Sequence, residues 1–234
     1  MSDKHLSSQF DADLNDISSK VLEMGGLVES QIITAMQALN TFDVEIADRV
    51  IETEKRLNIM EVEIDEECIN VIARRQPTAR DLRLLMAFSK TVANLERAGD
   101  EAEKIAKRTK RILDDGNART VNITEIKMSG EMAVNILRHA LDALARLDTV
   151  AAAQIVREDK AIDEEFRAFV RKLVTYMMED PRTISVGLDY LFIAKAIERI
   201  GDHAKNIAEL IIYIVKGTDV RHVPREQLER EALG

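Results

Sequence analysis

A five-residue segment with the pattern Glu-Arg-x-Gly-Asp occurs twice in this chain, at residues 96–100 and 198–202. In each copy the two carboxylates stand four residues apart, so on a helix they share one face with Cβ atoms about 5–6 Å apart. Each copy also places a glycine inside a helical pattern, where it costs about 1 kcal/mol relative to alanine. Two repelling acids beside a glycine, present twice, favour either a cation site built from oxygen ligands or a close crossing of helices.

The helix before each segment carries a second set of oxygen-bearing side chains. If the two helices pair antiparallel, matching Glu54 with Asp100 places the first turn at Pro77. The same pairing in the second half places the turn beside Pro181. Because helices usually end before a proline, both loops fall where the pairing needs them. The pairing predicts two metal sites, one made of Glu54, Asn58, Glu96 and Asp100, and one made of Asp159, Asp163, Glu198 and Asp202.

Acidic groups gathered in this way need a compensating charge. At close range, like charges repel by roughly 1 kcal/mol or more per pair. A divalent or trivalent cation removes the repulsion, and oxygen ligands suit Mg²⁺, Mn²⁺, Ca²⁺ or iron, with Zn²⁺ as a further candidate. Two alternatives stay open. The acids could form a solvated helix face, or Glu61 and Asp65 could pair with the first segment, although that register moves the turn past Pro77.

The elements that must position these residues are long helices, because apolar residues recur at steps of three and four. Asp43 is the expected N-cap of the second helix, and Asn122 with Glu125 resembles a capping box that opens the fourth. Gly217 is the expected stop of the sixth. The predicted helices run at about 10–39, 44–75, 81–113 and 122–147, from the turn before 148 to 179, and from the Pro181 loop to 216.

The second half of the chain repeats the first. With a shift of 105 residues Gly25 falls on Gly130 and Asp43 on Asp148, and the shift decreases to 102 residues at the Glu-Arg-x-Gly-Asp segments. Long helices joined by short turns pack as antiparallel bundles. We predict an all-α fold of two tandem three-helix bundles, at 9–115 and 122–217. Residues 218–234 form a C-terminal tail, with one short amphipathic turn or none.

Composition excludes several classes of protein. The net charge of −9 argues against nucleic acid as a partner, since phosphate backbones need clustered Lys and Arg. The longest apolar run, Leu210 to Val215, is too short to span a bilayer, so no direct membrane insertion is expected. The lone Cys68 suits a reducing compartment. We therefore expect a cytoplasmic protein.

Catalytic motifs are missing from the sequence. It holds no Glu-x-x-His pair of the kind found in di-iron bundle enzymes, no glycine-rich phosphate loop and no nucleophile elbow. We therefore expect no enzymatic activity. Charged residues near the two proline loops are candidates for a partner-binding surface, with simple helix-start polarity as the alternative. They are Arg80, Asp81, Arg83 and Arg182.

The doubled segment, preceded by Arg-Arg-Gln-Pro-Thr-Ala-Arg-Asp-Leu-Arg at residues 74–83, resembles the PhoU family of bacterial phosphate-uptake regulators. The likeness extends over nearly the whole chain, including Tyr-Met-Met-Glu-Asp at 176–180. It implies two three-helix bundles in tandem, a homodimer, and no catalysis. It also implies a role in restraining the phosphate-starvation response, with the ATPase subunit of the Pst ABC phosphate transporter and a sensor histidine kinase as partners. Such a protein would be cytoplasmic, or peripheral at the inner membrane through its partners.

The resemblance further implies metal clusters on Glu/Asp-x-x-x-Asp motifs. Three pairs in this chain match that motif: Glu96 with Asp100, Asp159 with Asp163, and Glu198 with Asp202. The fourth pair departs from the motif, because the residue four positions after Glu54 is Asn58 instead of an aspartate. An amide oxygen adds no charge, so we expect the second-half site to bind a cation more strongly than the first. The rival interpretations are a metal-dependent hydrolase or oxidase in a helical bundle, and a purely structural scaffold.

Overall fold

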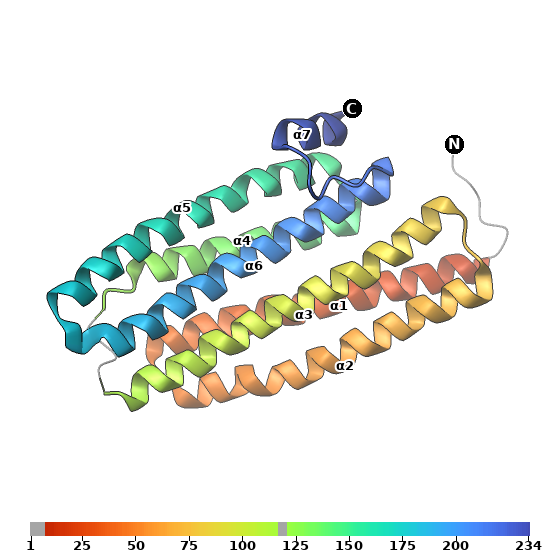
Figure 1. Ribbon diagram of the computed structural model, residues 1–234. Helices are drawn as coiled ribbons and strands as arrows, with labels where there is room; N and C mark the ends of the chain where they lie inside the picture. The colour runs from red at the N-terminus through yellow and green to blue at the C-terminus, as the bar shows by residue number, and fades with distance from the viewer. Residues whose placement is uncertain (1–7, 117–120) are drawn as a thin grey trace.

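The computed structural model describes residues 8–116 and 121–234, and over these residues the fold is all-α, as predicted. The helices lie side by side in an elongated bundle (Figure 1). They are α1 Ser8–Thr41, α2 Val44–Arg75, α3 Ala79–Asp114, α4 Thr124–Arg146, α5 Thr149–Glu179, the short 3-10 helix η1 Pro181–Thr183, α6 Ile184–Lys216 and α7 Arg225–Leu233. None of these helices is long and apolar enough to cross a membrane.

Local sequence explains where the helices begin and end. Asp43 Oδ1 accepts hydrogen bonds from the backbone N–H groups at the start of α2, at 2.9 and 3.1 Å, and Asp148 Oδ1 does the same for α5 at 3.0 Å. Gly217 ends α6 with φ of 80°, in the left-handed region that favours glycine. The predicted capping box does not form, because Glu125 pairs with Lys172 of α5 and α4 begins at Thr124.

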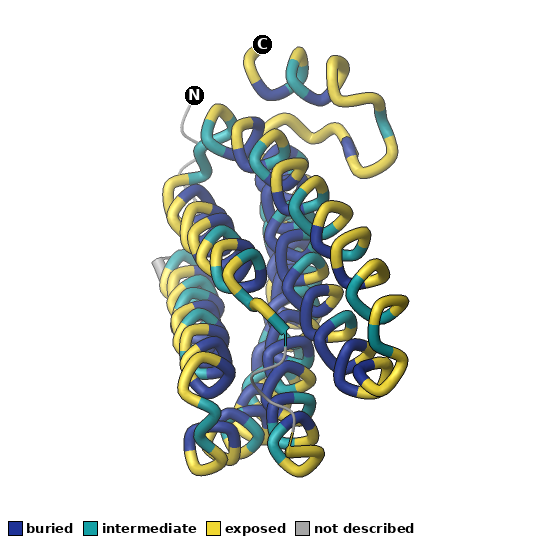
Figure 2. The backbone as a smooth tube through the Cα atoms, turned by 90° about the vertical axis from the view of Figure 1, so that its left-hand side faces the viewer, coloured by how far each residue is buried: buried dark blue, intermediate teal, exposed yellow. Residues whose placement is uncertain are grey.

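The six long helices pack as two groups that share a long seam. Helices α1, α2 and α3 contact one another, as do α4, α5 and α6, and the most extensive pair in the molecule is α3 with α6. These two central helices run in opposite directions (Figure 1). Buried residues line the inside of the bundle (Figure 2), and the apolar ones among them form one continuous core across both groups.

The two halves also meet in a reciprocal way where α1 contacts α4. A Cβ on Gly25 would overlap the side chain of Leu141, and a Cβ on Gly130 would overlap the side chain of Met36. At the repeat shift of 105 residues, Gly25 corresponds to Gly130 and Met36 to Leu141, so one contact occurs twice with its partners exchanged. This exchange is what a two-fold relation between the repeats produces.

The C-terminal segment is more ordered than the sequence predicted. Helix α7 packs against α5, where Thr149 Oγ1 donates to the Ala232 carbonyl at 2.8 Å. Arg157 of α5 also pairs with Glu229 at 2.7 Å, and Leu228 is buried. The amphipathic pattern after Pro224 therefore belongs to a docked helix.

Candidate metal centre

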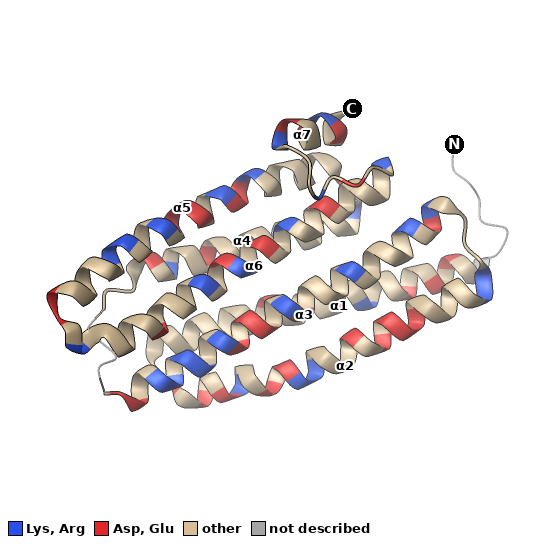
Figure 3. Cartoon of the chain, in the orientation of Figure 1, with Lys and Arg blue, Asp and Glu red and all other residues tan. Residues whose placement is uncertain are grey.

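Acidic residues occur along both α2 and α3 (Figure 3), and three carboxylates of the first half converge between these two helices. Ligand oxygens of Glu54, Glu96 and Asp100 all lie within 4.8 Å of one another. Glu54 is only 5% exposed, whereas the two acids on α3 are half-buried. Among the residues that the structure describes, no lysine or arginine forms an ion pair with any of the three. The predicted antiparallel pairing of these two helices thus brings three of the four first-site residues together.

Gly99 lets the two helices approach closely enough for this. A Cβ at this position would lie 2.6 Å from Leu57 Cδ1 and 3.0 Å from Glu54 Oε2. Real Cβ atoms do not approach another atom as closely as 2.6 Å, so alanine would force the Leu57 side chain to shift and would disturb the packing of α2 against α3. The glycine of the repeated segment is therefore explained by the space beside Glu54.

The surroundings of Glu54 disfavour its negatively charged form. The pKa of Glu54 is raised to about 7, mainly by burial and in addition by the charges of Asp100 and Glu96, while a hydrogen bond from Gln31 opposes the rise. Burial and the charges of Asp100 and Glu61 also raise the pKa of Glu96. Gln31 Nε2 donates to Glu54 Oε2 at 2.9 Å, but Glu54 Oε1 is buried without a hydrogen-bond partner. Burying an oxygen atom without a hydrogen-bond partner costs free energy. A bound cation would give Glu54 Oε1 a partner, so the three carboxylates suit a cation site.

The fourth predicted ligand does not join this group. Asn58 is exposed, because the inward stripe of α2 passes through Glu54, the fully buried Leu57 and then Glu61. Burial raises the pKa of Glu61, and the charges of Asp65 and Asp100 raise it further, which places Glu61 in the electrostatic field of the group. The alternative register, which pairs Glu61 and Asp65 with the segment and moves the turn past Pro77, is not adopted, because α2 ends at Arg75 and α3 begins at Ala79.

The second-half residues are arranged differently, although their helices pair in the same way. Asp159 is 4% exposed and approaches Gly201 as Glu54 approaches Gly99. Its Oδ2, however, lies 3.2 Å from Lys205 Nζ, which also lies 3.9 Å from Asp202 Oδ1. Over the described residues, these acids are not among the groups whose carboxylate oxygens converge within ligand distance. The geometry therefore favours a cation site in the first half of the chain. The sequence analysis expected the stronger site in the second half, because Asn58 adds no charge to the first.

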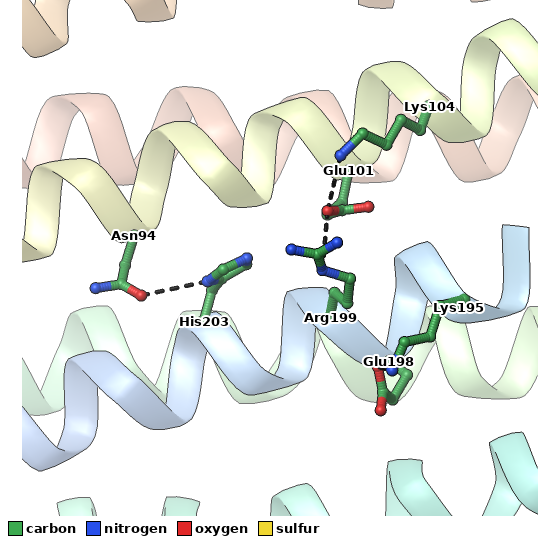
Figure 4. A network of polar contacts seen from close by, with 7 residues as sticks. All are labelled: Asn94, Glu101, Lys104, Lys195, Glu198, Arg199 and His203. Atoms are coloured by element: carbon green, nitrogen blue, oxygen red, sulfur yellow. Dashed lines mark hydrogen bonds and ion pairs between the residues drawn. The ribbon is translucent and has the colours of Figure 1, made fainter. Parts of the chain in front are cut away.

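The remaining second-half candidates also have other surroundings. Glu198 pairs with Lys195 at 2.5 Å (Figure 4), and Asp163 is half-buried. Burial raises the pKa of Asp159, while the charge and hydrogen bond of Lys205 oppose that rise. Burial would lower the pKa of Lys205, but the charge and hydrogen bond of Asp159 outweigh it and leave that pKa raised. The charge of Lys205 therefore offsets part of the cost of burying Asp159.

Comparison with known proteins decides the family. The model of the PhoU domain matches this chain twice, over residues 21–109 and 126–211, one match in each repeat. The chain belongs to the PhoU family.

Relatives match this PhoU-family chain along its whole length. A Burkholderia protein named phosphate-specific transport system accessory protein PhoU homolog is 58% identical and is covered completely, as is this chain. The accessory protein PhoU of Escherichia coli K12 is 47% identical over 99% of this chain and 95% of its own. The crystal structure of PhoU from Pseudomonas aeruginosa superposes with a TM-score of 0.86 at 46% identity, covering 89% of this chain and all of that one. These names describe accessory proteins, and PhoU is not an enzyme family, in agreement with the prediction of no catalysis.

The predicted partner-binding residues of this PhoU-family chain lie at two opposite ends. Residues 80–83 begin α3, whereas Arg182 lies in the α5–α6 connection at the other end of the bundle (Figure 1). Arg80 is exposed, but the guanidinium of Arg83 packs beside Gly217, about where α6 ends, and Asp81 accepts from Thr78 at 3.5 Å. Arg182 pairs with Asp180 at 2.9 Å. These residues therefore do not form one continuous surface.

A polar network in the α3–α6 seam escaped the sequence analysis. Glu101 is buried and pairs with Arg199 at 3.2 Å and with Lys104 at 2.9 Å, and Asn94 contacts His203 at 3.2 Å (Figure 4). Burial, followed by the charge of Arg199, lowers the pKa of His203 to about 4. His203 is therefore neutral at ordinary pH and faces the seam instead of the acids. Only knowledge that α3 lies against α6 could have revealed this network.

Proposed function

We propose that this chain is a non-enzymatic regulator of phosphate uptake that acts as an accessory protein of a phosphate-specific ABC transporter. The observation that carries the proposal is the match of both repeats, end to end, to proteins named for that role. A regulator of this kind restrains the phosphate-starvation response by linking the ATPase subunit of the transporter to a sensor histidine kinase. It works in the cytoplasm as a homodimer, and reaches the inner membrane through its partners.

We further propose that the first-half group holds a hard divalent or trivalent cation. Glu54, Glu96 and Asp100 would provide the ligands, with Glu61 close by. Oxygen-only ligands favour Mg²⁺, Mn²⁺ or iron over Zn²⁺, which takes nitrogen and sulfur more readily. The bound charge would neutralise the acids and fasten α2 to α3. A scaffold with solvated acids fits less well, because Glu54 is 5% exposed.

We propose that partner docking uses the end of the bundle where α3 begins. Arg80 is exposed there and forms no ion pair within the described part of the chain, so it is available to pair with a partner's acid. Arg182, at the opposite end, is engaged by Asp180 and provides the control.

The regulatory role is tested in a strain that lacks this gene and carries a reporter of phosphate-starvation genes. We expect the intact chain to silence the reporter in phosphate-rich medium and to bind purified transporter ATPase and kinase domains at micromolar concentration. Arg80→Glu should weaken binding by about tenfold, equivalent to about 1.4 kcal/mol, and Arg182→Glu should not. A chain that neither silences the reporter nor binds either partner would rule the role out.

A further inference from the structure

The two repeats carry opposite charges at two corresponding positions beside the acidic groups. With the shift of 102 residues that places Glu96 on Glu198, Glu103 falls on Lys205 and Lys107 falls on Glu209. In the first half Lys107 pairs with Glu103 at 2.7 Å, and over the described residues it forms no ion pair with the three converging carboxylates. In the second half the order of the two charges is reversed, and the lysine takes the position nearer to the acids.

Lys205 occupies the space that a cation would need. Its Nζ lies 3.2 Å from Asp159 Oδ2 and 3.9 Å from Asp202 Oδ1, between one acid of α5 and one of α6. The side chain is half-buried, so its ammonium is held among these groups. A hard cation bonds to oxygen at about 2.0–2.6 Å, and it would have to displace this ammonium against like-charge repulsion.

The surroundings of the two buried acids differ accordingly. Glu54 corresponds to Asp159 at the shift of 105 residues, and Gln31, which donates to Glu54, corresponds to Ile136. The first-half acid thus has a neutral amide donor and one buried oxygen without a partner. The second-half acid has no such donor from α4, and receives a full positive charge from Lys205.

We propose that Lys205 is the resident cation of the second acidic group, so that its ammonium excludes metal from this half of the chain. The two repeats have therefore diverged. The acidic group of the first repeat takes a metal ion from solution, whereas the acidic group of the second repeat is compensated by the ammonium of Lys205. The comparison between halves rests on the proposed cation site at Glu54, whereas the role of Lys205 in its own half stands independently.

The test measures Mn²⁺ binding, by titration calorimetry and by the electron paramagnetic resonance of free Mn²⁺, in variants with the first group disabled by Glu54→Gln. We expect this background to bind no Mn²⁺. Adding Lys205→Met should create a site whose Mn²⁺ dissociation constant lies at least roughly tenfold below the weakest binding that the measurement detects. Adding Lys160→Met should create none, because Lys160 is exposed and, as the residue after Asp159, it points about 100° away from Asp159 around α5.

Folding is monitored at the same time. Lys205→Met leaves Asp159 buried without its partner, so Lys205→Gln, which keeps a polar donor, serves as the milder variant. In both, Mn²⁺ should raise the melting temperature, and it should not do so in the Glu54→Gln background alone.

Two results would overturn the role of Lys205. One is that neither Lys205 variant gains Mn²⁺ binding. The other is that Glu54→Gln still binds Mn²⁺ and loses it on Asp159→Asn, since the lysine would then be no barrier. A wild-type chain that binds no Mn²⁺ would instead refute the proposed first-half site, and a gain of binding in Lys205→Met would still support the second-half inference.

Discussion

Gln31 Nε2 donates a hydrogen bond to Glu54 Oε2 across 2.9 Å, which joins α1 to the acids that lie between α2 and α3. The same amide nitrogen lies 3.2 Å from the carbonyl of Val50, so it is fixed on two sides. A neutral donor satisfies one carboxylate oxygen without supplying charge. The first-half group is thus positioned by the protein while its negative charge stays uncompensated.

The first prediction concerns the pH dependence of the metal-free protein. The folded pKa of Glu54, about 7, lies above its ordinary value of 4.5, so the folded state binds more protons than the unfolded state between these values. Stability that Glu54 contributes at low pH is therefore lost as the pH rises through about 7. Glu54→Gln should remove this loss and stabilise the chelator-treated protein at pH 8 by about 1–2 kcal/mol, after allowance for solvent screening.

Urea unfolding at pH 5.5 and pH 8 measures the effect, with Glu52→Gln as the control because Glu52 is exposed on the same helix. Equal curves for the two variants, or a loss of stability in Glu54→Gln at pH 8, would contradict the assignment of a strained, ionised Glu54.

The second prediction concerns the glycine of the repeated segment. Gly99→Ala places a Cβ 2.6 Å from Leu57 Cδ1 and 3.0 Å from Glu54 Oε2, so it should cost about 1–3 kcal/mol of stability and weaken Mn²⁺ binding. Gly26→Ala provides the matched control, because that helical glycine has open space where the Cβ would go. It should stabilise the protein by about 0.5–1 kcal/mol. If both substitutions stabilise the fold, Gly99 is not required for the close approach.

The third prediction concerns the seam between the repeats. Arg108 of α3 pairs with Asp189 of α6 at 2.7 Å and lies over the ring of Phe192 at 4.3 Å, and Asp189 is 1% exposed. Arg108→Ala leaves a buried carboxylate with only Arg111 nearby, at 3.7 Å, and should cost about 2–3 kcal/mol. Arg182→Ala breaks a pair whose arginine side chain is 90% exposed, and should cost less than about 1 kcal/mol. Thermal unfolding compares the two variants, and equal losses would mean that the buried seam pair stabilises the fold no more than the exposed pair does.

Much of the fold follows from local signals in the sequence. Apolar periodicity located the long helices, Asp43 and Asp148 marked two helix starts, and the proline loops fixed which helices pair. The repeat was visible because Gly25 and Gly130 must both be small for α1 to contact α4. Each of these signals acts within one helix or one hairpin.

The composition of the site depended on contacts that are not local. The spacing of four residues from Glu54 led to the prediction of Asn58 as a ligand. In the structure Leu57 occupies the inward-facing position of α2, and Asn58 is exposed to solvent. Lys205 was overlooked because its ammonium reaches Asp159 on a neighbouring helix, and a long side chain can reach in several directions. Carboxylate spacing alone could not show which half holds a compensating charge.

The most direct test of the metal site is anomalous diffraction from crystals soaked in Mn²⁺. We predict a Mn²⁺ peak bounded by Glu54, Glu96 and Asp100, and no peak between Asp159 and Asp202, where Lys205 Nζ should remain. A peak at Asp159 and Asp202 with none at Glu54, or no peak at either group at millimolar Mn²⁺, would contradict the proposed cation site.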